Sequence, residues 1–300
     1  MKRPIVRLSS LQLTNIKNVK NGTIYMPNTV NKILSADKAE ILGIYGQNGS
    51  GKTAIVDALY FLQKVMVGAD LDQSLEDYMT IDSDTAEIFA DFNIFMDGIV
   101  FEIGYTLSLS REEKEIVIKR EILRSAKNEN GIRTNKTTFM DYQRDQTDVI
   151  FKPQKRLDEI LEANKEIKTD LIVARKMAEK SNCSYIFGES SREIFCREYK
   201  NGFQQFSVII SSLFEFALKD LFVIRNTHSG VISANFVLPM AFRIENDNIG
   251  AKGDFAVPLT EPILVDEERK NLLETIVEQI NIVLYTIIPG LQVTIKNYGK

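Results

Sequence analysis

The chain has 300 residues, of which 44% are apolar and 26% are charged. These fractions are typical of soluble globular proteins and exclude collagen-like, low-complexity and wholly disordered chains. The 37 basic and 41 acidic residues leave a formal charge of −4, so any contact with a polyanion must come from a local patch.

The amino terminus, MKRPIVRLSS, lacks the apolar run of a secretory signal peptide. The most apolar later segment, residues 206–224, contains Glu215, Lys219 and Asp220, which favours a buried helix over a membrane span. Two cysteines and one histidine cannot supply a four-ligand Cys/His zinc site within one chain. We therefore expect a cytoplasmic protein with free thiols and no contact with a membrane.

The strongest motif is GQNGSGKT at residues 46–53, which fits the Walker A pattern of a phosphate-binding loop. The apolar run at 41–45 predicts a buried strand before the loop. Residues 53–68 carry apolar side chains at helical spacing and predict a helix after it. Strand, glycine-rich loop and helix are the context that this motif requires.

Each position in the motif has a physical reason. Glycines allow backbone angles closed to other residues, so the loop can turn its N–H groups toward phosphate oxygens. The start of the helix adds further N–H groups and the positive end of its dipole. The lysine supplies a charge for the β and γ phosphates, and the Thr53 hydroxyl is suited to ligating Mg²⁺. The predicted nucleotide-binding residues of the loop are Gly46, Gln47, Asn48, Gly49, Ser50, Gly51, Lys52 and Thr53.

The base is predicted from the lack of a guanine-reading motif. The Asn-Lys pairs at Asn31, Asn135 and Asn164 are not followed by the Asp that would accept hydrogen bonds from guanine. A DxxG string at 247–250 lies in a polar stretch and is interpreted as a turn. We therefore expect ATP, with Mg²⁺, rather than GTP.

The segments LSSLQLTNIKNVKNGTIYMPN and ILGIYGQNGSGKTAIVDALYFL resemble the amino-terminal lobe of ATP-binding-cassette head domains, and SMC, RecF and OLD-nuclease-like AAA family ATPases are the most similar. The resemblance implies an α/β P-loop NTPase fold of the ABC type with a flanking antiparallel β-sheet. It also implies that Lys17 or Asn18, in TNIKN, approaches the nucleotide from the side opposite the loop. The alternative for these two residues is a charged strand end in water.

The same resemblance implies that ATP promotes a homodimer or another head-to-head assembly. The process that it implies is DNA maintenance or defence against foreign DNA, with DNA or a protein effector as candidate partners. That implication is an analogy with similar proteins and does not follow from the residues themselves.

Three regions are predicted. Residues 1–150 form the nucleotide-binding lobe with its antiparallel β subdomain, in which alternation around Asp97-Gly98 predicts a hairpin. Another strand pair is expected around Ile116, Ile118 and Ile122. Residues 151–260 form a mainly helical insertion, and residues 261–300 supply a helix and a strand that return to the ATPase core.

Within the insertion, the spacing of apolar residues predicts an amphipathic helix at 152–180. The helix is either a packed insertion or the stump of a coiled-coil arm, for which the apolar repeat is short. Arg192, Arg197 and Lys200 alternate with aromatic residues Phe195, Tyr199 and Phe203. They form either a small surface for nucleic acid or a partner, or a solvated charged face, since Glu193 and Glu198 lie among them. His228, in a polar turn, is interpreted as a surface residue.

The candidate catalytic acids are Asp266 and Glu267, in PILVDEER. Adjacent acids after an apolar run resemble a Walker B motif that ligates metal and activates water. However, Pro262 and the short apolar run suit a central strand poorly, and Asp266 also fits the N-cap of the helix that follows. No signature motif precedes these acids, so we expect the chain to be the front part of a longer ATPase.

Two functions of different classes follow. The first is an ATPase of the ABC/SMC/RecF type that dimerises on ATP. The second is a nucleotide-gated protein-interaction module with little or no hydrolysis by this chain alone. A P-loop kinase is a weaker third reading, because no acceptor site or arginine lid is identifiable in the sequence.

Overall fold

The computed structural model describes residues 3–71, 78–112, 115–144, 146, 150–151, 154–197, 203–223, 225–226 and 232–233. It also describes residues 274–275, 277–278, 281–282 and 285. By its contacts the chain divides into two units, Met1–Arg225 and Asn226–Lys300. Most of the described helices and strands belong to the first unit, to which the fold and the site below are confined.

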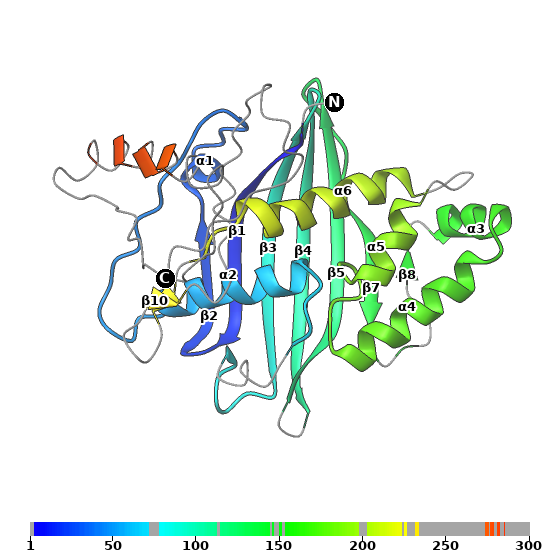
Figure 1. Ribbon diagram of the computed structural model, residues 1–300, viewed down its shortest axis with the longest axis horizontal. Coiled ribbons are helices and arrows are strands. Elements are labelled where there is room, and N and C mark those ends of the chain that lie inside the picture. Colours follow the sequence, from blue (N-terminus) through cyan, green and yellow to red (C-terminus); the bar gives the residue numbers. More distant parts are fainter. Residues whose placement is uncertain are drawn as a thin grey trace, which may run out of the picture. The chain divides into compact units, whose positions relative to one another are not determined.

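The described part of the first unit contains an eight-stranded antiparallel sheet (Figure 1). The strand order is β2-β1-β3-β4-β5-β7-β8, and β6 pairs with β5 outside this path. The strands are β1 Ile5–Ile16, β2 Val19–Tyr25, β3 Thr85–Met96, β4 Ile99–Glu112, β5 Glu115–Glu129, β6 Ile132–Arg133, β7 Thr137–Gln143 and β8 Ile150–Phe151. The amino-terminal strand β1 is therefore an interior strand of the sheet, hydrogen-bonded on both sides.

The predicted hairpin is confirmed as β3 and β4. Met96 pairs with Ile99, and the two residues between them, Asp97 and Gly98, have φ angles of 45° and 82°. Positive φ at both positions matches the twist of a two-residue hairpin turn, and Asp-Gly is suited to it. The strand pair expected around Ile116, Ile118 and Ile122 is confirmed only in part, because all three residues lie in the single strand β5, which pairs with β4 on one side and with β7 on the other.

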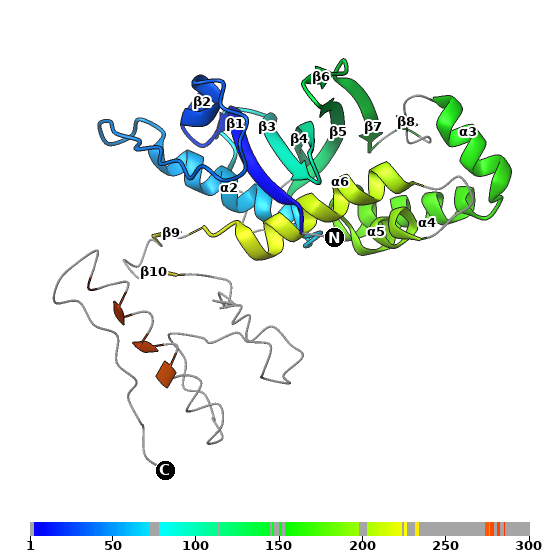
Figure 2. The same ribbon diagram turned by 90° about the horizontal axis from the view of Figure 1, so that it is seen from above.

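Helices cover one face of this sheet. Figure 2 shows α2, α4, α5 and α6 on the same side of the strands. The helices are α1 Pro27–Val30, α2 Lys52–Met66, α3 Gln154–Ala163, α4 Ile167–Ser181, α5 Glu189–Cys196, α6 Gln204–Glu215 and the π-helix η2 Phe216–Asp220. Two further short strands, β9 Arg225–Asn226 and β10 Ile232–Ser233, pair with each other.

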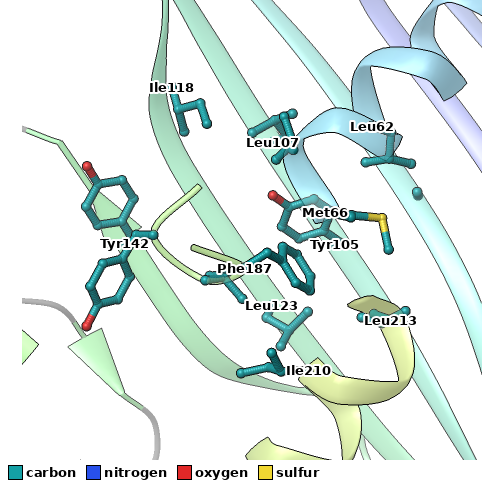
Figure 3. Packing of buried hydrophobic residues seen from close by; sticks show 14 of the residues in the cluster. Leu62, Met66, Tyr105, Leu107, Ile118, Leu123, Tyr142, Phe187, Ile210 and Leu213 are labelled. Atoms are coloured by element: carbon teal, nitrogen blue, oxygen red, sulfur yellow. The ribbon is translucent and has the colours of Figure 1, made fainter. Parts of the chain in front are cut away.

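The core lies between the helices and the sheet. Figure 3 shows Leu62 and Met66 of α2 beside Tyr105 of β4, with Phe187 next to the Tyr105 ring. The two rings meet edge to face, with centroids 5.4 Å apart. All four side chains are almost fully buried, so α2 is fixed to the sheet by apolar packing along its length.

One carboxylate is buried within this core. Glu121 of β5 accepts hydrogen bonds from the Tyr105 hydroxyl at 2.6 Å and from the Tyr185 backbone N–H at 2.7 Å. Burial raises the pKa of Glu121 above its ordinary value, and burial together with the Glu121 charge raises the pKa of Tyr105. Glu121 thereby joins the sheet to the loop at residues 182–188, between α4 and α5.

The strand predicted at 41–45 is not present, and this prediction is wrong. These residues have irregular backbone, and Ile41 and Tyr45 are 92% and 93% exposed. A strand requires a partner for its N–H and C=O groups, and no strand among the described residues pairs with this run. The sheet that holds α2 is instead the antiparallel one.

The helix predicted at 152–180 is two helices. The described α3 ends at Ala163 and α4 begins at Ile167, with Asn164 donating from its side chain to the Ile160 carbonyl at 3.0 Å. Asn competes for local backbone groups in this way and thereby ends helices. Ile160 and Ile167 are buried in the core, so both helices pack against the rest of the first unit, as the first alternative predicts.

The apolar helix predicted at 206–224 is confirmed in its first part as α6, which is followed by η2. The described chain holds no helix with the length and apolar character needed to cross a membrane.

At residues 192–203 the two described aromatic rings expected to alternate with cations on a surface are not exposed. Phe195 and Phe203 are buried and their rings contact each other edge to face. The Arg192 guanidinium lies 3.6 Å from the centre of the Phe214 ring, and Arg197 pairs with Asp170. Tyr199 and Lys200 lie outside the described residues.

Candidate functional site

The predicted phosphate loop is exposed and leads directly into a helix. Residues 46–50 are exposed, and α2 begins at Lys52. Gly49 and Gly51 have φ angles of 81° and 90°, in the left-handed region that favours glycine. Helix α2 itself follows the predicted apolar spacing, and its buried face includes Ala54, Ala58 and Phe61.

The side chain of Lys52 folds back and contacts the backbone of the loop. The Lys52 Nζ donates to the carbonyl oxygens of Gly46 and Gln47, both at 2.7 Å, and lies 3.4 Å from the Ser50 Oγ. The ammonium is thus positioned at the centre of the loop. An anion entering the loop would replace neutral carbonyl acceptors by charged oxygens, and hydrogen bonds to charged acceptors are stronger.

The start of α2 is suited to an anion. Its N-cap is Gly51, which has no side chain to accept from the first-turn N–H groups, and the first turn carries no acidic residue. These N–H groups have no acceptor within the helix. They point outward at the positive end of the helix dipole, which favours a negatively charged ligand.

Thr53 is the candidate metal ligand. It is exposed, in the first turn of α2. The described residues contain no group of three or more His, Cys, Asp or Glu side chains placed to hold a metal ion. A threonine hydroxyl at this position can ligate a Mg²⁺ ion that also binds phosphate oxygens.

The structure places Lys17 and Asn18 beside the loop, in the turn between β1 and β2. Their side chains, however, contact protein groups. The Lys17 ammonium forms an ion pair with Asp57 of α2, and the Asn18 side-chain amide donates to the Gly49 carbonyl. Asn18 is exposed and Lys17 is half-buried, and each is bound to the loop or to its helix.

Two residues of this arrangement were not identified from the sequence. Asp57 is buried, on the face of α2 that packs against the sheet, and Val19 lies against Gly51. A Cβ on Gly51 would lie 2.6 Å from the Val19 Cγ2. The available signal was Asp57 itself, since a single acid among apolar helix positions needs a partner when buried.

Asp266, Glu267 and His228 lie outside the described residues.

One family model matches the chain. A model described as "AAA domain, putative AbiEii toxin, Type IV TA system" matches residues 41–169. This range contains the loop, α2 and the strands β3 to β8. No curated protein matches the chain. The match supports an AAA-type P-loop ATPase family and a nucleotide-binding function, and the α/β architecture fits a P-loop NTPase-like fold.

Proposed function

We propose that the chain is an ATP-binding ATPase of the ABC/SMC/RecF type that holds Mg-ATP at residues 46–53. The observation that carries this proposal is the conjunction of the left-handed Gly49 and Gly51 with an uncapped helix start at Lys52. The loop N–H groups and the helix dipole would bind the phosphates, and Lys52 would exchange its loop carbonyls for phosphate oxygens. Mg²⁺ bound at Thr53 would neutralise phosphate charge.

In this proposal, residues 1–150 are the nucleotide-binding lobe, residues 151–260 a mainly helical insertion, and residues 261–300 a return to the ATPase core. The exposed apolar residues of the 41–45 run, Ile41, Ile44 and Tyr45, support a core that includes more chain than the antiparallel sheet. Asp266 and Glu267 are the candidate acids for hydrolysis. Turnover that is lost in Glu267→Gln would support this role, and turnover that survives it would assign the pair to a helix cap.

The binding claim is tested with a fluorescent ATP analogue. Lys52→Ala removes one charge-assisted contact to phosphate, so its affinity should fall by about 10–100-fold. Lys64→Ala, in the last turn of the same helix, is the matched control and should bind as the unchanged protein does. Equal binding by the unchanged protein and Lys52→Ala would reject the loop as the nucleotide site.

We also propose that ATP and Mg²⁺ drive the chain into a homodimer or another head-to-head assembly, in DNA maintenance or in defence. The description of the matching family, which names a toxin of a type IV toxin–antitoxin system, favours defence. DNA and a protein effector are the candidate partners, and a cytoplasmic location is part of the proposal. Sedimentation with ATP and Mg²⁺ tests the assembly, and a chain that stays monomeric would contradict it.

A second candidate function is a nucleotide-gated interaction module. Helix α4 exposes Ile172, Val173 and Met177 at 44%, 49% and 53%, which favours contact between this helix and another protein. The two functions differ in turnover. Binding of ATP without hydrolysis would support the module, whereas dimerisation with hydrolysis would support the ATPase.

A further inference from the structure

We infer that the turn between β1 and β2 positions the phosphate loop, with Asn18 acting through Gly49 and Lys17 acting through Asp57, and neither touching the nucleotide. This inference rests on the proposed function, because it concerns the geometry of the same loop. It assigns to both residues a role different from the direct nucleotide contact expected from the sequence.

Both residues of the turn, and the first residue of β2, contact the loop or its helix. Lys17 forms the ion pair with Asp57, Asn18 donates to the Gly49 carbonyl, and Val19 lies against Gly51. These residues therefore meet the loop at Gly49 and Gly51 and meet α2 at Asp57, six residues after Gly51. Contacts at this spacing fix both the position of the loop and the direction in which the helix leaves it.

The Asn18 contact sets the orientation of one peptide plane. In a trans peptide the C=O and the following N–H point in opposite directions. Because the Gly49 carbonyl is turned toward Asn18, the Ser50 N–H points into the loop, where it donates to the Gln47 carbonyl at 3.2 Å. If this plane were reversed, a carbonyl oxygen would face the phosphates in place of an N–H group. Asn18 thus holds one donor of the anion-binding loop in its useful direction.

The Lys17 contact acts on the helix. The Asp57 side chain is 5% exposed and that of Lys17 is 29% exposed, so the ion pair is directed into the protein. The ammonium also lies 5.5 Å from the centre of the Tyr78 ring. A carboxylate this buried is costly unless it is paired, which makes the pair a strong constraint on α2 relative to the turn.

The turn is itself held firmly. Lys17 has a φ angle of 49°, which is unfavourable for a residue with a side chain. Its backbone N–H donates to the Tyr78 carbonyl at 2.8 Å, and its carbonyl accepts from the Thr80 hydroxyl at 2.7 Å. Strained backbone persists where the surroundings determine it, and such positions concentrate at functional sites. The turn can therefore act as a fixed support for the loop.

The Asn18 contact is tested by Asn18→Asp, which keeps the shape of the side chain but removes its donor. MgATP displacing a fluorescent ATP analogue should show an affinity about tenfold weaker, as expected for one lost hydrogen bond and a repelled carbonyl. Asn18→Gln keeps a donor on a longer side chain and should recover part of the loss. Unchanged affinity in Asn18→Asp would overturn this part of the inference.

The Lys17 contact is tested by a double-mutant cycle. If Lys17 acts through Asp57, then Lys17→Met and Asp57→Asn each weaken MgATP binding by about tenfold, and the double variant is no weaker than either. If Lys17 touched phosphate directly, Asp57→Asn would leave the affinity unchanged or increase it, and that result would overturn the inference. Lys17→Arg should restore binding, because it keeps the charge.

Two further variants separate positioning from folding. Lys17→Gly removes the side chain but relieves the backbone strain, so it should fold at least as stably as Lys17→Met while binding MgATP as weakly. Arg133→Met removes an exposed ion pair with Glu102 on the sheet and should not change the affinity. Lys52→Ala is run beside them. If Lys52→Ala loses binding while the turn variants bind normally, the positioning role is rejected and the nucleotide site stands. If Lys52→Ala binds normally, the proposed nucleotide site itself is rejected.

Discussion

The carboxylate of Glu121 accepts a hydrogen bond from the Ser184 hydroxyl at 2.6 Å, and Ser184 belongs to the loop between α4 and α5. This contact ties the sheet to the helical layer through a fully buried acid. The same loop lies against the end of α2, because a Cβ on Gly68 would meet the Phe187 carbonyl at 2.6 Å. The helix that begins at the phosphate loop therefore ends against a loop held by Glu121.

The raised pKa of Glu121 predicts a pH-dependent stability. The stabilisation that Glu121 gives the folded state is fully present below the ordinary pKa of 4.5, where the carboxyl is protonated. This stabilisation is lost as the pH rises through the raised pKa. Glu121→Gln cannot ionise, so the free energy of unfolding of the unchanged protein should fall relative to that of the variant as the pH increases. Denaturant unfolding at a series of pH values measures this. If the free energy of unfolding of the unchanged protein instead rose relative to that of the variant with increasing pH, the prediction would be wrong.

Truncation of the same residue should be costly at all pH values. Glu121→Ala leaves the hydroxyls of Tyr105 and Ser184 and the Tyr185 N–H without their acceptor. Each buried donor left unpaired costs about 1–3 kcal/mol, so a loss of about 3 kcal/mol or more is expected. Urea unfolding at neutral pH provides the measurement, with Glu121→Gln as the control that keeps the volume.

Gly51→Ala should disturb the loop more than Gly49→Ala does. Both glycines have φ near +85°, with 81° at Gly49 and 90° at Gly51, so each alanine carries about 1–2 kcal/mol of backbone strain. Only at Gly51 does the added Cβ also collide with Val19, whereas nothing lies within 4 Å at Gly49. Thermal unfolding should rank the two variants in this order. The double variant Gly51→Ala/Val19→Ala should lose the extra destabilisation, and if it does not, the collision is not its cause.

Gln63 should support the π-helix η2. Its side-chain amide donates to the carbonyls of Ala217 at 2.9 Å and of Leu221 at 2.6 Å. Gln63→Met keeps the length but loses both bonds, so about 1–2 kcal/mol of stability should be lost. Hydrogen exchange should become faster in η2, which the Gln63 amide holds against α2. Equal exchange in both proteins would mean that packing alone holds η2.

The two cysteines should differ in reactivity. Burial, with the nearby charges of Asp70 and Glu121, raises the pKa of Cys183 to about 11, whereas Cys196 is exposed. In a Cys196→Ser background, labelling of Cys183 in the folded protein should be slow at pH 7 and should increase about tenfold per pH unit until near that pKa. Labelling of Cys183→Ser reports Cys196, which should react quickly. A fast, pH-independent Cys183 would contradict the burial.

The sequence predicted the local features of this fold and of its site. The Asp97-Gly98 turn, the spacing of apolar residues along α2 and the glycines of the loop are each encoded within a few residues. Contacts between distant segments could not be predicted in this way. The ion pair of Lys17 with Asp57 depends on β1 lying beside α2, which no local pattern specifies.

The wrong predictions have the same cause. The 41–45 run has strand-like composition, yet no described strand pairs with it, and composition does not say whether a partner exists. The break between α3 and α4 has no glycine or proline to mark it. Of the two alternatives left open at residues 192–203, a binding surface would need exposed rings, but Phe195 and Phe203 are buried in contact with each other and with Phe206.

Because β1 lies between β2 and β3, its two neighbours in the sheet become available at different times during synthesis. As the nascent chain leaves the ribosome, β1 meets β2 at once, but its second neighbour begins only at Thr85. A lone two-stranded hairpin is marginally stable, and Tyr78 and Thr80, which hold the turn at Lys17, also come late. The segment 46–66 therefore emerges before the surface that will hold it exists. A chain arrested before Thr85 would carry every residue of the phosphate loop and of the turn that contacts it, but not β3, the strand that pairs with β1 on its other side.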